Sequence, residues 1–132
     1  MTDPQSRKSS LRAATRVLDR AAAVGFDWDS PLPVLDKLHE ELAELTVEIT
    51  TKDSQQNRII DEFGDLLLVM VNLARHLRLD PDQAIQAATA KFERRFGFIA
   101  ESLELQGKTL AESNLAEMES LWQQAKQREK SS

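Results

Sequence analysis

The chain has 132 residues, a net charge of −5 at pH 7 and no cysteine. Its length suits a single domain with one core, and the lack of cysteine excludes disulfides and thiolate metal sites. The sequence holds only two histidines, so we expect any bound metal to have oxygen ligands rather than the nitrogen ligands of a zinc site.

The charge is unevenly distributed along the chain. Residues 36–65 contain nine acidic and three basic residues, which accounts for the whole negative excess. A protein that binds a nucleic acid polymer should instead present a basic face, so we expect no such partner. The sequence shows neither the apolar core of a signal peptide nor the roughly 20 apolar residues that cross a bilayer, so we expect a cytoplasmic protein with no membrane contact.

Helical periodicity dominates the chain and strand patterns are nearly absent, which predicts an all-α fold. Gly25 should close the first helix, and two N-cap and first-turn pairs, Ser30 with Pro31 and Asp80 with Pro81, should open later ones. We expect a bundle of about five helices built on an antiparallel acidic hairpin, in chain order over residues 10–24, 31–50, 56–77, 81–105 and 115–126.

The third predicted helix contains the run LLLVMV at residues 66–71 and is apolar on nearly all sides. Such a helix should be the buried, central one. A chain this short can hardly cover it with its own helices, so we expect a homodimer or a larger homo-oligomer. The polar ends, residues 1–9 and 129–132, should be flexible, which leaves a single domain over residues 10–128.

Four carboxylates are placed symmetrically about Asp53. Glu41 and Asp65 each lie twelve residues from it, and Glu44 and Glu62 each lie nine. If the second and third helices fold back at this point, the two acids on each helix share a face and meet their counterparts. Such a cage suits Mg²⁺, which takes oxygen ligands at about 2.0–2.1 Å and usually keeps waters and substrate phosphates, whereas four acids without a cation would repel one another. The pattern therefore predicts a metal site for phosphate chemistry.

Two other interpretations compete with this cage. Acid pairs three residues apart are common on solvated helices, so either half of the pattern alone is weak evidence. A di-iron carboxylate bundle needs a Glu-x-x-His motif on each of two helices, and neither His39 nor His76 has a glutamate three residues before it. Asp65 directly precedes the most apolar run, where an unpaired carboxylate would be costly, and this favours the metal site.

Residues 25–126 resemble the MazG-type nucleoside triphosphate pyrophosphohydrolases, in particular the carboxy-terminal catalytic domain of the two-domain bacterial members. The stretches that carry the resemblance are GFDW, VLDKLHEELAEL, DEFGDLLLVMVNLARHL, AIQAATAKFERRF and LAEMESLWQQAK. The resemblance implies the all-α NTP pyrophosphatase fold for the catalytic domain, with Mg²⁺ as the cofactor and Mn²⁺ as its substitute. Two features depart from the pattern: the other domain of the long members does not appear in this sequence, and Asp61 stands where glutamate is expected.

Carried over residue by residue, the resemblance assigns the metal to the four symmetric acids, Glu41, Glu44, Glu62 and Asp65. Glu40 and Glu41 are the catalytic candidates of the hairpin. Glu40 is implied to orient the attacking water or to lie next to the metal ligands, and its alternative is a solvated helix acid. Lys37, one turn before Glu41, is implied to contact phosphate, and its alternative is a surface salt bridge with Glu40 or Glu41.

Further residues are implied to bind the nucleotide. Lys91 and Arg95 share a helical face and would clamp the triphosphate and stabilise the leaving group, so they are also catalytic candidates. Trp122 and Lys126 are implied to face the nucleotide, although a late helical aromatic is also typical of a core anchor. Asn72, on the same face as the acids, could reach the sugar or base or could be a satisfied buried amide.

The resulting hypothesis is Mg²⁺-dependent hydrolysis of a nucleoside triphosphate to monophosphate and pyrophosphate, with water attacking the α-phosphorus. We expect broad acceptance of standard or altered triphosphates, because no residue visibly reads a base edge. One rival is an enzyme of the same fold specific for dUTP, dCTP or phosphoribosyl-ATP. The other is a non-catalytic helical oligomerisation module. Trp28 lies in a loop that could cover the site or fold on the core.

Overall fold

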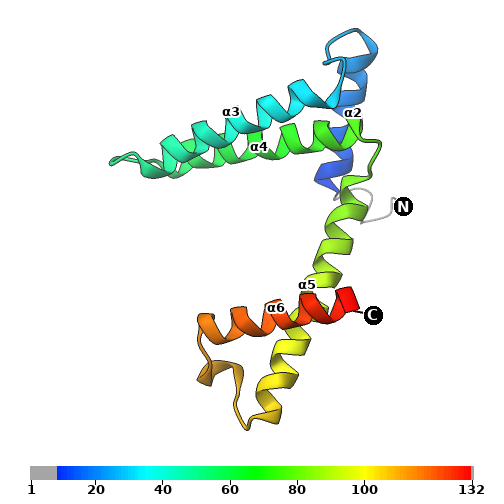
Figure 1. Cartoon of the computed structure of the whole chain (residues 1–132). Coiled ribbons are helices and arrows are strands. Elements are labelled where there is room, and N and C mark those ends of the chain that lie inside the picture. Colours follow the sequence, from blue (N-terminus) through cyan, green and yellow to red (C-terminus); the bar gives the residue numbers. More distant parts are fainter. Residues whose placement is uncertain (1–8, 132) are drawn as a thin grey trace, which may run out of the picture. The chain divides into compact units, whose positions relative to one another are not determined.

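The structure, a computed structural model, describes residues 9–131. Over these residues it confirms the predicted all-α class, since it contains no strand. Five α-helices and one short 3-10 helix follow one another as α2 (Ser10–Ala23), α3 (Pro31–Thr50), α4 (Gln56–His76), α5 (Pro81–Leu105), η1 (Leu110–Glu112) and α6 (Leu115–Ser131) (Figure 1). None of these helices combines the length and the apolar character that a membrane crossing requires.

The observed helix boundaries agree with the predicted ones to within one residue, apart from the end of the last helix. α6 continues to Ser131 instead of ending near Lys126. Residues 129–131, which were expected to be part of a flexible tail, are therefore helical. Of the expected flexible amino-terminal segment, residues 1–8 lie outside the described part of the chain.

The end of α2 shows why Gly25 stands where it does. The Gly25 N–H donates to the Ala22 carbonyl at 3.0 Å, and the Phe26 N–H donates to the Ala21 carbonyl at 2.9 Å. These two bonds form a Schellman motif, which needs a residue in the left-handed region at its C′ position. Gly25 has φ +93°, a conformation that costs glycine little because it has no Cβ atom.

The N-caps were predicted at the correct positions, but they do not all act through their side chains. Ser30 precedes α3, yet its hydroxyl makes no capping hydrogen bond. Asp80 precedes α5, and its Oδ1 accepts from the Asp82 N–H at 3.0 Å. Asn114 precedes α6, and its Oδ1 accepts from the Glu117 N–H at 2.8 Å. The last two contacts satisfy backbone donors that a helix start leaves unpaired.

The described residues divide into two compact units, one ending at Ala84 and one beginning at Ile85. In the first unit α3 and α4 form an antiparallel hairpin, joined by residues 51–55 and packed side by side (Figure 1), and α2 packs against α4. The hairpin therefore has the form that the symmetric acids require. That both units belong to one domain stays a prediction.

Within a single chain α4 is not buried on several sides, which agrees with the expectation that a chain this short can hardly cover it. Its only buried residues are Val71, Asn72 and Ala74, whereas Leu67 and Met70 are 44% and 51% exposed. The reason is that α4 packs mainly against α3 and α2, which leaves part of its apolar surface uncovered. Apolar residues on both helices of the hairpin share this exposure, namely Leu42, Val47, Ile49, Ile60, Phe63, Leu67 and Met70.

The second unit has its own small core between α5 and α6. Ile99 and Leu103 of α5 pack with Leu121 of α6, and the partly buried Met118 and Trp122 pack against these three. This contact joins the carboxyl-terminal half of α5 to α6, and it includes Trp122, one of the residues that the sequence analysis had assigned to substrate binding.

Candidate metal centre

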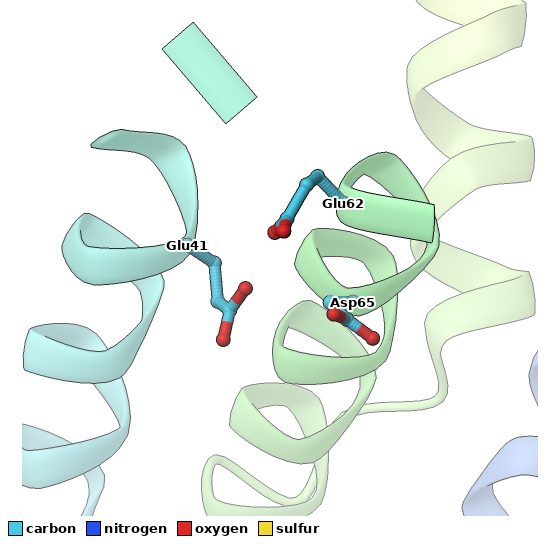
Figure 2. Close-up of side chains that lie close together, drawn as sticks. All are labelled: Glu41, Glu62 and Asp65. Carbon is cyan, nitrogen blue, oxygen red and sulfur yellow. The ribbon is translucent and has the colours of Figure 1, made fainter. Parts of the chain in front are cut away.

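Three carboxylates meet between the helices of the acidic hairpin. Glu41 comes from α3, whereas Glu62 and Asp65 lie one turn apart on α4, and the three side chains converge on one space (Figure 2). Each offers an oxygen atom, and these oxygens lie within 4.8 Å of one another. The structure thus brings together three of the four acids that the symmetric spacing singled out.

The fourth predicted ligand, Glu44, lies beside the cluster. It is not part of the group of three, but it is close enough to Glu62 for its charge and a shared hydrogen bond to raise the pKa of Glu62. Its position one turn after Glu41 on α3 accounts for this, since residues three apart on a helix are neighbours. A metal-binding role for Glu44 stays a prediction.

The electrostatics of the cluster favour a bound cation. Desolvation raises the pKa of Glu62, and the charges of Glu44, Glu41 and Asp65 raise it further. Desolvation likewise raises the pKa of Asp65, and Asp61 and Glu41 add to this effect. Like charges that share a small volume disfavour ionisation in this way, and a cation among them would reverse the effect.

Two oxygen atoms of the cluster lack a partner among the described residues. Glu41 Oε2 and Glu62 Oε2 are both buried and accept no hydrogen bond, and Glu41 as a whole is only 6% exposed. An unpaired buried carboxylate oxygen is costly, because water no longer solvates it. A divalent cation with oxygen ligands would satisfy both atoms, so these residues fit Mg²⁺.

Lys37 and Glu40 form a charged rim on α3. Lys37 Nζ lies 3.4 Å from Glu41 Oε1 and 3.8 Å from Glu40 Oε1. The hydrogen bond to Glu41 and the charge of Glu40 raise the pKa of Lys37. The salt bridge that the sequence offered as an alternative for Lys37 is therefore present. The Glu40 side chain is 63% exposed, so it is a solvated acid next to the cluster, and contact of either residue with substrate stays a prediction.

Asn72 takes part in a network that the sequence did not reveal. Its side chain is 6% exposed, and its Oδ1 accepts from Arg75 Nη1 at 2.7 Å. The same Arg75 donates through Nε to Asp19 Oδ1 at 2.7 Å and through Nη1 to Asp27 Oδ2 at 3.2 Å. One guanidinium thus joins α2, the loop after it and α4. No local sequence pattern could have shown this network, because Asp27 and Asp19 lie 48 and 56 residues before Arg75 in the sequence.

Asp27 anchors the loop that carries Trp28. Its Oδ1 accepts from the Trp28 N–H at 2.8 Å and contacts His76 Nε2 at 2.9 Å. Desolvation raises the pKa of Asp27, but the hydrogen bonds from His76, Trp28 and Arg75 outweigh this and lower it to about 2. The loop is therefore fixed to the end of α4 by a carboxylate that stays ionised.

The residues predicted to clamp the triphosphate lie in the second unit. Arg95 is already engaged there, since its Nη2 lies 2.8 Å from Glu129 Oε2 and its guanidinium lies 5.2 Å from the centre of the Trp122 ring. Lys91 is exposed and Lys126 is half-buried. Contact of Lys91, Arg95 and Lys126 with substrate stays a prediction. Glu129, which the sequence analysis did not single out, is the residue that holds Arg95.

Trp122 contributes to the core of the second unit. Its ring lies 5.3 Å from that of Phe92 in a tilted arrangement, and it packs against the cluster of Ile99, Leu103 and Leu121. This is the core-anchor alternative that the sequence left open. Base stacking by Trp122 stays a prediction.

Comparison with known proteins bears on the residues of both units. Residues 29–97, slightly more than half of the chain, match the family model described as the MazG nucleotide pyrophosphohydrolase domain. This stretch contains the acidic cluster together with Lys91 and Arg95, whereas Trp122 and Lys126 lie beyond it.

Several relatives show the same likeness over a longer range. The chain is 40% identical over 126 residues to a nucleoside triphosphate pyrophosphohydrolase of Escherichia coli (strain K12), which covers 96% of this chain and 48% of that protein. It is also 40% identical over 117 residues to a Thermotoga maritima protein named nucleoside triphosphate pyrophosphohydrolase/pyrophosphatase MazG, covering 89% of this chain and 44% of the relative. The chain therefore spans about half the length of these curated relatives.

Proposed function

The chain belongs to the MazG nucleotide pyrophosphohydrolase family, and we propose that it hydrolyses nucleoside triphosphates to monophosphates and pyrophosphate with the help of Mg²⁺. The observation that carries this proposal is the meeting of Glu41, Glu62 and Asp65, which includes two buried oxygens that no group of the described residues satisfies. Such a site favours a divalent cation, and a nucleoside triphosphate is the kind of anion that such a cation would bring to an acidic surface.

The chain's own carboxylates would hold the cofactor. Glu41, Glu62 and Asp65 are the ligands that we propose, with Glu44 as the fourth. Mn²⁺, which also takes oxygen ligands, would substitute for Mg²⁺. When bound, the ion would neutralise charge on the phosphoryl oxygens and lower the pKa of a water molecule.

The reaction balances as a simple hydrolysis. The oxygen of water forms a bond to the α-phosphorus, the bond from that phosphorus to the oxygen that bridges to the β-phosphate breaks, and pyrophosphate leaves. Glu40, exposed on the rim, would accept the proton of the water. Lys37 on the same rim would attract the polyphosphate.

The remaining site residues are part of the proposal on the strength of the resemblance. Lys91 and Arg95 would bind triphosphate oxygens, for which the planar fork of Arg95 is well suited. The proposal for Arg95 has a chemical basis in the structure, because Arg95 already forms a forked contact with the Glu129 carboxylate. Trp122 and Lys126 are proposed as nucleotide contacts by resemblance alone.

An assay of pyrophosphate release tests the proposal directly. The purified chain is incubated with a mixture of nucleoside triphosphates and Mg²⁺, and we expect pyrophosphate to appear and to cease when EDTA removes the metal. Hydrolysis in ¹⁸O-labelled water should place the label in the monophosphate, because the α-phosphorus is attacked. Label in pyrophosphate, or release of inorganic phosphate alone, would contradict the proposed reaction.

We also propose that the chain acts as a homodimer or larger homo-oligomer. The exposed apolar residues of α3 and α4, among them Val47, Ile60 and Phe63, support this proposal, because monomers rarely leave so many large apolar side chains on one hairpin in contact with water. Light scattering at micromolar concentration should give a multiple of 14.9 kDa. The proposed cellular setting is the cytoplasm, where nucleoside triphosphates and Mg²⁺ are both abundant.

A further inference from the structure

The second unit contains a cavity in which one acid lies among arginines. It has a volume of about 360 Å³ and lies between α5 and α6. The residues that line it are Arg94, Arg95, Phe98, Ala125, Arg128 and Glu129. Guanidinium groups around a cavity favour an anionic ligand, so the presence of Glu129 among them needs a physical reason.

Glu129 contacts one edge of the Arg95 guanidinium. Arg95 Nε donates to Oε1 and Oε2 of Glu129 at 3.3 and 3.2 Å, and Nη2 donates to Oε2 at 2.8 Å. A guanidinium carries one N–H on Nε and two on each terminal nitrogen. The contact therefore leaves both N–H groups of Nη1 and one of Nη2 for another acceptor, and Nη1 makes no hydrogen bond within residues 9–131.

The Arg95 side chain is restricted on more than one side. Its guanidinium lies over the Trp122 ring, 5.2 Å from the ring centre, and the side chain is only 14% exposed. A free arginine side chain loses much rotamer freedom when it binds a ligand. Because Glu129 and Trp122 already restrict Arg95, binding of an anion at its open edge costs less conformational entropy.

The surroundings of Glu129 stay positively charged in spite of its carboxylate. The hydrogen bond and the charge of Arg95 lower the pKa of Glu129. Two further cations of α5, Arg94 and Lys91, act in the same direction, and Arg128 lines the same cavity. One carboxylate among these cations reduces their mutual repulsion and still leaves an excess of positive charge for an anion.

We propose that Glu129 is a positioning residue, which holds Arg95 by its Nε edge so that the Nη1 edge is presented to the phosphate groups of the substrate. This inference rests on the proposed function, since it takes Arg95 to bind a triphosphate. It extends that function to a residue outside the predicted site. The opposite interpretation is that Glu129 competes with phosphate for Arg95, and the two interpretations predict opposite changes in affinity.

Glu129→Gln is the decisive variant, because it keeps the shape of the side chain and removes its charge. Isothermal titration calorimetry with inorganic tripolyphosphate, at a constant Mg²⁺ concentration, measures the affinity. We expect the dissociation constant to rise about tenfold, since a charge-assisted contact that orients Arg95 is weakened. Glu129→Asp, which keeps the charge, should recover part of the affinity. A lower dissociation constant in Glu129→Gln would indicate competition and overturn the proposal.

Glu119→Gln is the matched control. It removes the same charge from α6, but Glu119 accepts its hydrogen bond from Gln123 of the same helix, at 3.2 Å. We expect its dissociation constant for tripolyphosphate to stay at the wild-type value, with both variants folded by urea unfolding. Equal changes in the two variants would point to the net charge of α6 instead of Arg95, and would overturn the proposal.

A double-mutant cycle tests whether Glu129 acts through Arg95. Arg95→Met removes the guanidinium and keeps an apolar side chain next to Trp122. In that background Glu129→Gln should change the dissociation constant of tripolyphosphate by less than about twofold. A purely structural role of Glu129 would weaken binding equally in both backgrounds, and that result would overturn the proposal.

The same titrations separate this proposal from the proposed activity. If the Glu129 variants and the cycle behave as expected but no triphosphate yields pyrophosphate, the proposed function fails and the positioning role stands. If pyrophosphate is released while Glu129→Gln binds tripolyphosphate like the wild type, the positioning role alone is refuted. A wild-type chain that binds no tripolyphosphate would refute it as well, because Arg95 would then have no polyphosphate to receive.

Discussion

The two units differ in how completely their charged side chains are paired. In the hairpin of α3 and α4, Glu41 and Glu62 each bury an oxygen that has no hydrogen-bond partner among the described residues. Between α5 and α6, Arg95 donates to both oxygens of Glu129 and lies over the Trp122 ring. The second unit pairs its cation with a carboxylate, whereas the acidic cluster leaves one oxygen of each of two carboxylates without a partner among residues 9–131, and the proposed metal ion would supply the positive charge for these oxygens.

The largest expected effect comes from removing the most buried acid. Glu41→Gln keeps the shape of the side chain but removes its charge, so we expect kcat/KM for pyrophosphate release to fall by about 10³-fold, since several kcal/mol of metal-dependent stabilisation are lost. Circular dichroism should show unchanged helical content. The matched control is Glu48→Gln, an acid of the same helix outside the cluster, which should keep wild-type activity. A fully active Glu41→Gln would remove the assignment of metal to this cluster.

The next effect concerns stability with and without the metal. Mg²⁺ at 100 times its dissociation constant should stabilise the wild-type chain by about 2.7 kcal/mol, because it binds the folded state only. In Glu62→Gln the unfolding temperature should respond much less to Mg²⁺, and without metal it should be higher than in the wild type, because one repelling charge is gone. Calorimetric scans at equal ionic strength measure both effects. An equal response of the two proteins to Mg²⁺ would contradict the site.

Replacing Trp122 should affect the stability of the fold more than the binding of substrate. Trp122→Ala removes a ring that packs against Phe92 and the core of the second unit, so the free energy of unfolding in urea should fall by about 2 kcal/mol. Trp122→Phe, which refills part of that volume, should recover about half of the loss. If instead KM rises while the unfolding curve stays in place, Trp122 is a nucleotide contact and not a core anchor.

The smallest expected effect on stability comes from Asp27, the ionised carboxylate that fixes the loop after α2. The pKa of Asp27 is about 2 in the folded chain, below its ordinary value of 3.8. Its stabilising contribution is therefore fully present above about pH 4 and is lost as the pH falls toward 2. Asp27→Asn should lower the free energy of unfolding at pH 7 by about 1 kcal/mol. Denaturation at a series of pH values should show the wild type and the variant converging below pH 3.

The acidic cluster could be predicted from the sequence because helical geometry is regular. Glu41, Glu62 and Asp65 lie at fixed positions on two helices of known period, and a single short connection fixes which residues face one another. Glu44, one turn after Glu41 on the same helix, falls outside the group but stays close to Glu62. The outline of the helices followed from the same regularity and from their caps.

Other features depended on information that no local pattern carries. Arg75 meets Asp19 and Asp27 only because α2 and its loop pack against the end of α4, and Glu129 meets Arg95 only because α6 extends past its predicted end. The exposure of α4 agrees with the expectation that so short a chain can hardly cover this helix by itself. Its apolar sequence requires cover, but it does not say which partner supplies that cover.

A cavity of about 470 Å³ lies between α2, the loop after it and α4, and the left-handed turn at Gly25 shapes one of its walls. The residues directly after it, Phe26 to Trp28, line the cavity, and they leave α2 in the direction that φ +93° imposes. An ordinary L-residue at this position would meet no neighbouring atom, yet it would strain the backbone. The shape of this cavity thus rests on an achiral residue, and a chemically synthesised chain with a mirror-image alanine there would be expected to preserve it.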